Sequence, residues 1–181
     1  KEKPKDTSHV LRWKYGKANE EQSLTYRRKN SYKSLVTGAI GIKKDIFLKH
    51  TTVLNHLYGL DMLLAYQLKL ANAKVKHIEN PVYHLGLENN AAFLHKTKEA
   101  IKTIVYLEEN NIISNDFRPI QRAYSKLRFL KLHWFCILAF KLFNTILEQN
   151  ISGKSPSLFA FNIYRMLYFC YIKQVKTEEN D

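Results

Sequence analysis

Short apolar runs with β-branched or alternating character mark the first half of the chain. The segment 35–42 is β-branched, punctuated by glycine and almost uncharged, which predicts a buried strand. The segment 74–78 alternates and predicts a second strand, and a third extended segment is expected at 81–85, after the break at Asn80-Pro81. This half therefore predicts strands separated by short helical or polar segments.

Helical spacing of apolar residues dominates the second half, and start and stop residues bound several of the expected helices. Asp61 stands before strong helix formers, as an N-cap would, and Asn72 suits a helix end. Asn89 or Asn90 can cap the next helix, and Pro119 suits the first turn of another. Helices are expected near 61–71, 90–109, 119–149 and 157–175.

These elements predict a mixed α/β segment over residues 1–88, followed by a helical C-terminal region over residues 89–181. Two or three strands are too few for a self-contained sheet with both faces covered. The α/β segment is therefore expected to be the end of a larger domain. A chain that opens on Lys1 rather than methionine agrees with that expectation, so we expect a fragment.

The charge balance is strongly basic, with 29 Lys+Arg against 16 Asp+Glu and a formal net charge of +13. Such a field favours anionic partners, which include nucleic acid, acidic lipid head groups and nucleotide phosphates. The aromatic residues stand mostly at helical core spacing, which argues against a base-stacking surface for nucleic acid. Cys136 and Cys170 form no CxxC pair, so both are expected to be reduced, in a reducing compartment.

The most specific pattern lies between Tyr58 and Glu88. Tyr58-Gly59-Leu60-Asp61 precedes a predicted helix, and His77-Ile78-Glu79-Asn80-Pro81-Val82-Tyr83-His84-Leu85-Gly86-Leu87-Glu88 follows it. This second segment resembles, nearly residue for residue, a strand of Bacteroidetes-type family 2 glycosyltransferases. Members of that family also carry Gly-x-Glu-Asp at the start of a helix. Here Leu60 replaces the Glu, and Asp61 keeps the position of the family's Asp.

The resemblance implies the C-terminal part of a nucleotide-diphospho-sugar transferase fold (GT-A-like, Rossmann-like), followed by a helical region. It implies Asp61 as the catalytic base, and Gly59, Thr37 and Gly38 as substrate-binding residues. It implies His84 as a ligand of a divalent cation, Mg²⁺ or Mn²⁺. The alternatives from the residues alone are that Asp61 only caps its helix and that His84 packs at a strand edge.

The reaction that the resemblance implies is an inverting transfer of a sugar from a nucleotide-diphospho-sugar donor to a glycan or lipid-linked acceptor. The setting would be cell-surface polysaccharide synthesis in the cytoplasm, at the inner face of the cell membrane. The chain contains no Asp-x-Asp pair. It is therefore expected to lack the nucleotide-binding half and to be inactive in isolation. The alternatives are a basic helical module that binds membrane or nucleic acid, and an inactive truncated glycosyltransferase.

The helices expected at 119–149 and 157–175 combine basic and aromatic residues, and two interpretations are open. One is a face that meets an anionic membrane surface, and the other is ordinary packing with a solvated charged side. No stretch approaches the roughly 18–20 apolar residues that span a bilayer, so any membrane association is expected to be peripheral and salt-sensitive. The basic residues of the membrane interpretation are Arg128, Lys131, Lys141, Arg165 and Lys173.

Overall fold

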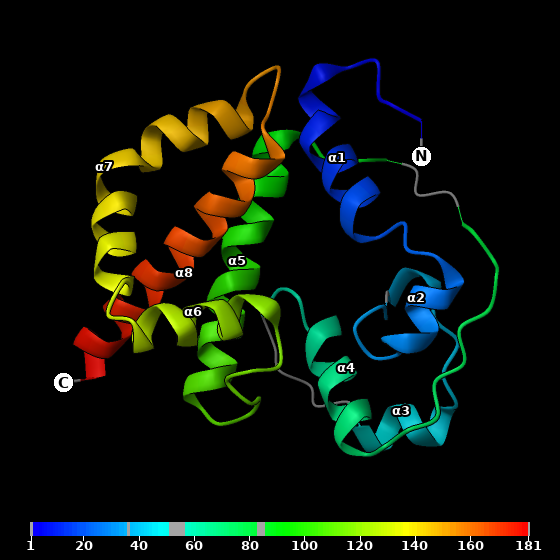
Figure 1. The fold of residues 1–181 in the computed structure, drawn as a ribbon. Coiled ribbons are helices and arrows are strands. Elements are labelled where there is room, and N and C mark those ends of the chain that lie inside the picture. Colours follow the sequence, from blue (N-terminus) through cyan, green and yellow to red (C-terminus); the bar gives the residue numbers. More distant parts are fainter. Residues whose placement is uncertain (1, 36, 51–56, 83–85, 181) are drawn as a thin grey trace.

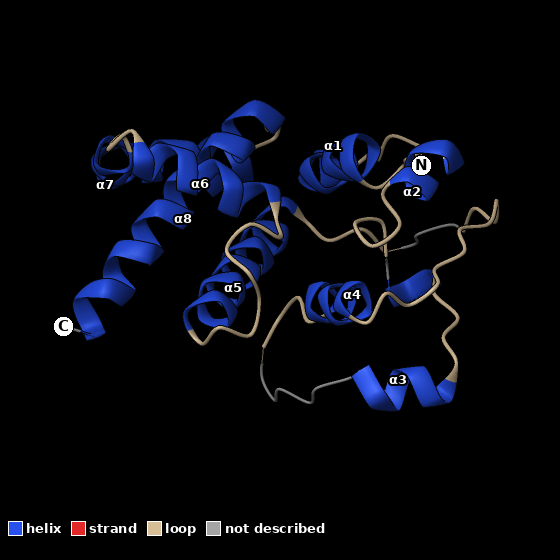
Figure 2. Cartoon of the chain, turned by 60° about the horizontal axis from the view of Figure 1, so that its bottom comes forward, coloured by secondary structure: helices blue, strands red, loops and turns tan. Residues whose placement is uncertain are grey.

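The computed structural model describes residues 2–35, 37–50, 57–82 and 86–180, and every regular element within them is helical (Figures 1 and 2). The elements are η1 (Thr7–His9), α1 (Val10–Asn19), α2 (Leu24–Lys29), η2 (Thr37–Ala39), α3 (Lys44–His50), α4 (Asp61–Leu70), α5 (Asn90–Glu109), α6 (Pro119–Phe129), α7 (His133–Ser152) and α8 (Leu158–Asn180).

The predicted α/β fold is wrong. Within the described ranges the chain forms no strand and no sheet, so a GT-A-like, Rossmann-like architecture is not present. Where 35–42 was expected as a strand, Thr37–Ala39 forms a single 3-10 turn. The segment 74–78 has no regular structure, and 83–85 lie outside the described residues.

Side chains, rather than a neighbouring strand, bind the backbone around 74–78. The hydroxyl of Tyr32 donates to the carbonyl of Ala73 at 2.8 Å, and the guanidinium of Arg27 donates to the carbonyl of Ile78 at 3.2 Å. A strand needs a partner whose backbone completes the hydrogen-bond ladder. The described chain offers no such partner here, so this segment runs as an extended loop along α2 and the turn that follows it.

The larger hydrophobic core lies between α1, α5, α7 and α8. Leu11 of α1 and Ile101 of α5 are buried there with Phe140 of α7, whose ring lies 5.7 Å from that of Tyr164 on α8. These four helices pack against one another, and α6 crosses α8 at the edge of the group (Figure 1). α5 and α8 thus form the frame on which α1, α6 and α7 pack.

A smaller core joins α4 to the C-terminal end of α5. Met62 and Leu63 of α4 pack with Leu107 of α5 and with Ile113 and Phe117 in the loop before α6. α1 packs on α5 through the larger core, and α4 packs on α5 through the smaller one. Both cores therefore join residues before the expected boundary at residue 88 to residues after it.

Three helices end on a non-glycine residue in the left-handed conformation: Asn72 after α4, Asn111 after α5 and Lys131 after α6. The prediction that Asn72 ends its helix is confirmed, as are the starts at Asn89–Asn90 and Pro119. The single helix expected at 119–149 is wrong. The chain breaks at Lys131, whose φ is 57°, and α6 and α7 meet at a bend of 112°.

None of the described helices is, by itself, long and apolar enough to cross a membrane, although α6 and α7 pass that test as a bent pair. Cys136 and Cys170 are free thiols on α7 and α8. Burial, and then the neighbouring Cys136, raise the pKa of the Cys170 thiol well above its usual range.

Candidate functional site

Asp61 is the first residue of α4, and its side chain is exposed. The N-cap is Leu60, so the alternative in which Asp61 serves as the cap does not hold. Within the described residues the Asp61 carboxylate accepts no hydrogen bond and forms no ion pair. A carboxylate at the start of a helix, free of partners within the described residues, is available to accept a proton from a bound hydroxyl.

Gly59 sets the direction in which the chain enters α4. Its φ is +88°, in the region that L side chains rarely adopt, and a Cβ added there would lie 3.6 Å from the Cβ of Ala100 on α5. The carbonyl of Gly59 also accepts the N–H of Met62 at 3.1 Å. Only glycine takes this conformation without strain, so the approach to Asp61 depends on it.

Lys96 of α5 links the two ends of the sequence window that carries the resemblance. Its ammonium group forms an ion pair with Glu88 and lies 5.7 Å from the centre of the Tyr58 ring. Burial, and then the charge of Glu88, raise the pKa of the Tyr58 hydroxyl, which stays protonated at neutral pH. The loop that leads to Asp61 and the residue that ends the motif therefore meet on one side of α5.

A second cationic group, Arg118, stands just before α6. Desolvation lowers the pKa of its guanidinium, whereas the nearby Tyr15 hydroxyl and the negative charge of Asp61 act in the opposite direction. Within the described residues that guanidinium donates no hydrogen bond and forms no ion pair. The backbone N–H of Arg118 donates instead to the carboxamide of Gln121 at 2.8 Å, which fixes the start of α6. Phe117, the residue before Arg118, packs against Met62 and Tyr66 of α4, so the start of α6 lies beside the helix that Asp61 opens.

The other predicted site residues are not brought to Asp61 by any described contact. Thr37 and Gly38 are exposed in η2, and a Cβ on Gly38 would meet nothing within 4 Å. His84 lies outside the described residues, so its predicted role as a metal ligand stays a prediction. In the part of the chain that is described, no group of three His, Cys, Asp or Glu side chains is placed to hold a metal ion.

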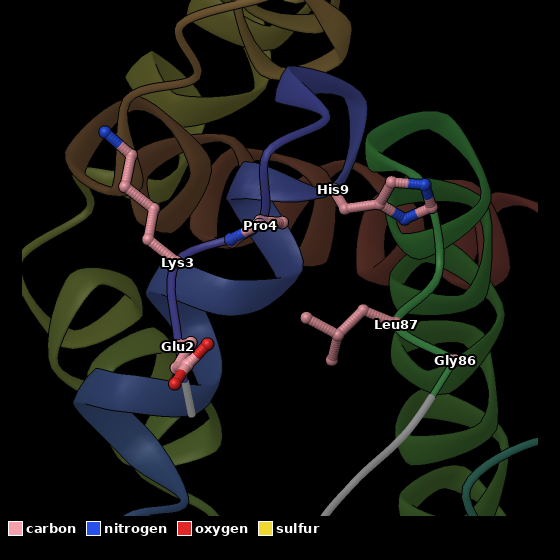
Figure 3. Close-up of a pocket in the computed structure, with 6 residues that line it drawn as sticks. All are labelled: Glu2, Lys3, Pro4, His9, Gly86 and Leu87. Carbon is pink, nitrogen blue, oxygen red and sulfur yellow. The ribbon is translucent and has the colours of Figure 1, made fainter.

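An open pocket of about 450 Å³ lies between the N-terminal segment and the loop before α5 (Figure 3). Gly86 and Leu87 line it from one side, and the ring of His9 reaches toward Leu87 from the other. Asp61 is not among its lining residues. The pocket therefore touches the end of the resembling segment but does not include the candidate base.

Comparison of the chain with protein-family models, with curated proteins and with solved structures gave no match.

Sequence reasoning missed the two cations of the site. Lys96 stands within a helix that holds two other lysines, Lys98 and Lys102, and Arg118 is one basic residue among 29 Lys+Arg. Neither has a local pattern that distinguishes it from a solvated surface charge. Only the fold, which places α5 against the loop before α4 and packs Phe117, just before α6, on α4, identifies them.

Proposed function

We propose that this chain carries the general base of a glycosyl-transfer reaction, and that Asp61 is this base. The observation that supports the proposal is the exposed Asp61 carboxylate at the start of α4, which pairs with no described residue and which follows the left-handed Gly59. The resemblance of Tyr58–Asp61 and His77–Glu88 to family 2 glycosyltransferases supplies the reaction. It does not supply the fold, because the described residues are helical.

In the proposed reaction an acceptor hydroxyl attacks the anomeric carbon of a nucleotide-diphospho-sugar. The new C–O bond forms as the bond from that carbon to the diphosphate breaks, and the nucleoside diphosphate leaves with the bonding electrons. The proton of the hydroxyl passes to the Asp61 carboxylate. A hydroxyl is a weak nucleophile unless a base takes its proton as the bond forms, which is the contribution of this residue.

One of the described basic groups suits the diphosphate of the donor in the same reaction. Arg118 offers a guanidinium that forms no described ion pair, and Arg is well matched to phosphate oxygens because its donors form a planar fork. Lys96 is already paired with Glu88 and serves to hold the loop in place. The described residues do not assemble a metal site, so no step is assigned to a divalent cation.

The test is a transfer assay on the complete encoded protein, with any residues that precede Lys1 included. A panel of uridine, guanosine and thymidine diphospho-sugars is offered with simple glycan and lipid-phosphate acceptors, and the product is examined by NMR. The proposal predicts acceptor-dependent release of nucleoside diphosphate and a product of inverted anomeric configuration. Retention of configuration, or the absence of transfer with every donor, would contradict it.

A further inference from the structure

α7 carries large apolar side chains on two opposite faces. On one face Ile137, Phe140 and Ile151 are buried in the larger core. At about 100° per residue, the positions opposite to these are mostly apolar, with Thr145 and Gln149 as the polar ones, yet they are exposed. A helix on the surface of a water-exposed protein normally turns polar residues outward. We call the exposed set the α7 face: Trp134, Phe135, Leu138, Leu142, Phe143 and Ile146.

The exposure of the α7 face is substantial for side chains of this size. Phe135 is 69% exposed, and Leu142 and Ile146 are each 63% exposed. The end of α6 and the turn that follows it add Phe129 at 87% and Leu130 at 60%. α7 forms one edge of the molecule in both views, with α2 and α3 toward the opposite side (Figures 1 and 2). Contiguous apolar surface of this kind marks a site of interaction.

The charged residues of the stretch that carries the α7 face are basic. The sequence from Pro119 to Leu147 contains no acidic residue, and Glu148, which follows, pairs with Lys98 at 2.7 Å. A second copy of this chain would oppose like charges across an isologous contact, which is unfavourable. The exposed basic residues of this stretch are Arg122, Lys126, Arg128, Lys131 and Lys141.

We propose that α7 lies in the interface of an anionic phospholipid bilayer, with the α7 face in the acyl boundary. The flanking Lys and Arg side chains would meet lipid phosphates, as in amphipathic helices that lie on membranes. α7 has 20 residues and is therefore roughly 30 Å long, which gives a long line of contact in the plane. The proposal rests on α7 and not on Asp61, so it holds or fails separately from glycosyl transfer.

Two of the five basic residues expected at a membrane face do not belong to it. Arg165 lies over the ring of Tyr15, with 5.5 Å from its guanidinium carbon to the ring centre. Lys173 pairs with Glu108 at 3.3 Å and with Glu109 at 3.5 Å. Arg128, Lys131 and Lys141 are exposed and remain in the proposed contact.

The test uses vesicles of phosphatidylcholine with phosphatidylglycerol, and vesicles of phosphatidylcholine alone. In a Trp13→Phe background, Trp134 is the remaining tryptophan and reports on α7. We expect binding to the anionic vesicles with a blue shift of Trp134 emission, and weaker binding at high salt because attraction to phosphates is screened over about 8–10 Å. Phe135→Gln with Leu142→Gln should weaken binding at least about tenfold.

The matched control is Leu70→Gln, since Leu70 is 66% exposed on α4, away from the α7 face. It should leave vesicle binding within about twofold of the unsubstituted protein. The proposal is overturned if anionic vesicles are not bound, or if the double variant binds as tightly as Leu70→Gln. It is also overturned if sedimentation shows a stable dimer that the double variant dissociates, because a second copy would then cover the face.

Discussion

The side-chain oxygen of Asn90 accepts the backbone N–H of Leu11 at 2.9 Å, although 79 residues separate them. The amide nitrogen of the same buried Asn90 donates to the carbonyl of Gly153 at 2.9 Å and to that of Thr7 at 3.2 Å. One side chain thus ties the start of α5 to α1, to the N-terminal segment and to the turn before α8.

Replacing Asn90 by Ala should therefore destabilise the fold strongly. Three backbone groups lose their partner in a buried place, and we expect the free energy of unfolding to fall by about 2–4 kcal/mol. Asn19, an exposed residue that donates to the carbonyl of Tyr15, is the control, and Asn19→Ala should change stability by at most about 0.5 kcal/mol. Urea unfolding of both variants measures the difference, and equal midpoints would contradict the assigned role.

Lys131 ends α6 in a conformation that glycine adopts more easily. The N–H of Leu132 donates to the carbonyl of Leu127 at 2.8 Å, and that of Lys131 to the carbonyl of Arg128 at 3.0 Å, which together form a Schellman motif. Lys131→Gly should raise the free energy of unfolding by about 0.5–1 kcal/mol because it relieves the positive φ. Lys126→Gly, inside α6, should lower it by about 1 kcal/mol. Thermal melting of the two variants measures both changes in stability. A loss of stability in Lys131→Gly would contradict the left-handed conformation of Lys131.

Tyr168 should make the protein sensitive to alkaline pH. Desolvation, followed by the charges of Glu99 and Glu148, raises the pKa of its hydroxyl from 10.0 to about 12. Below pH 10 the Tyr168 hydroxyl keeps its proton in both the folded and the unfolded chain, so its ionisation takes nothing from the free energy of unfolding. Between about pH 10 and 12 only the unfolded chain loses the proton, and roughly 2–3 kcal/mol of stability is lost.

The measurement is urea unfolding across this alkaline range for Tyr168→Phe and for Tyr26→Phe, an exposed control. Tyr168→Phe should lose less stability than the unsubstituted protein as the pH rises, whereas Tyr26→Phe should follow the unsubstituted curve. Parallel curves for all three proteins would refute the assignment to Tyr168.

The helix boundaries were predictable from the sequence wherever a single residue sets them. Asn89 caps α5 by accepting the N–H of Ala92 at 2.7 Å, and Pro119 opens α6. Lys131 was missed because a lysine carries no preference for the left-handed conformation. The prediction of a strand at 74–78 was wrong because alternation of apolar and polar residues indicates only an extended backbone. The sequence alone does not reveal whether a partner strand is present to complete the hydrogen bonds.

The residues of the candidate site likewise divide into those that a local sequence pattern predicted and those that only the packing reveals. Gly59 and Asp61 were predicted because they stand two residues apart in one local pattern, and the structure adds that Leu60, not Asp61, is the cap. Lys96 and Arg118 were not identified, because their relation to the site arises from the packing of α5 and the start of α6. Contacts between residues far apart in sequence leave no local pattern.

Gly59 provides a test of the backbone that leads to the site. Gly59→Ala places a Cβ at a φ of +88°, and we expect it to cost about 1–2 kcal/mol of stability. Gly38→Ala is the matched change, since a Cβ there meets nothing within 4 Å, and it should be neutral or slightly stabilising. Chemical denaturation distinguishes them, and equal stability of the two variants would mean that Gly59 does not require its left-handed conformation.

The most direct test of the account is the turnover number of Asp61→Asn in the complete encoded protein. Leu60 is the N-cap, so Asn at this position keeps the size of the side chain and leaves the helix end intact, but it does not accept the proton. Asp45→Asn, in the first turn of α3, is the control. The account predicts that kcat falls about 10²–10⁴-fold in Asp61→Asn, with unchanged melting, and that Asp45→Asn keeps full activity. Transfer by Asp61→Asn within about twofold of the unsubstituted enzyme would contradict the assignment of Asp61 as the base.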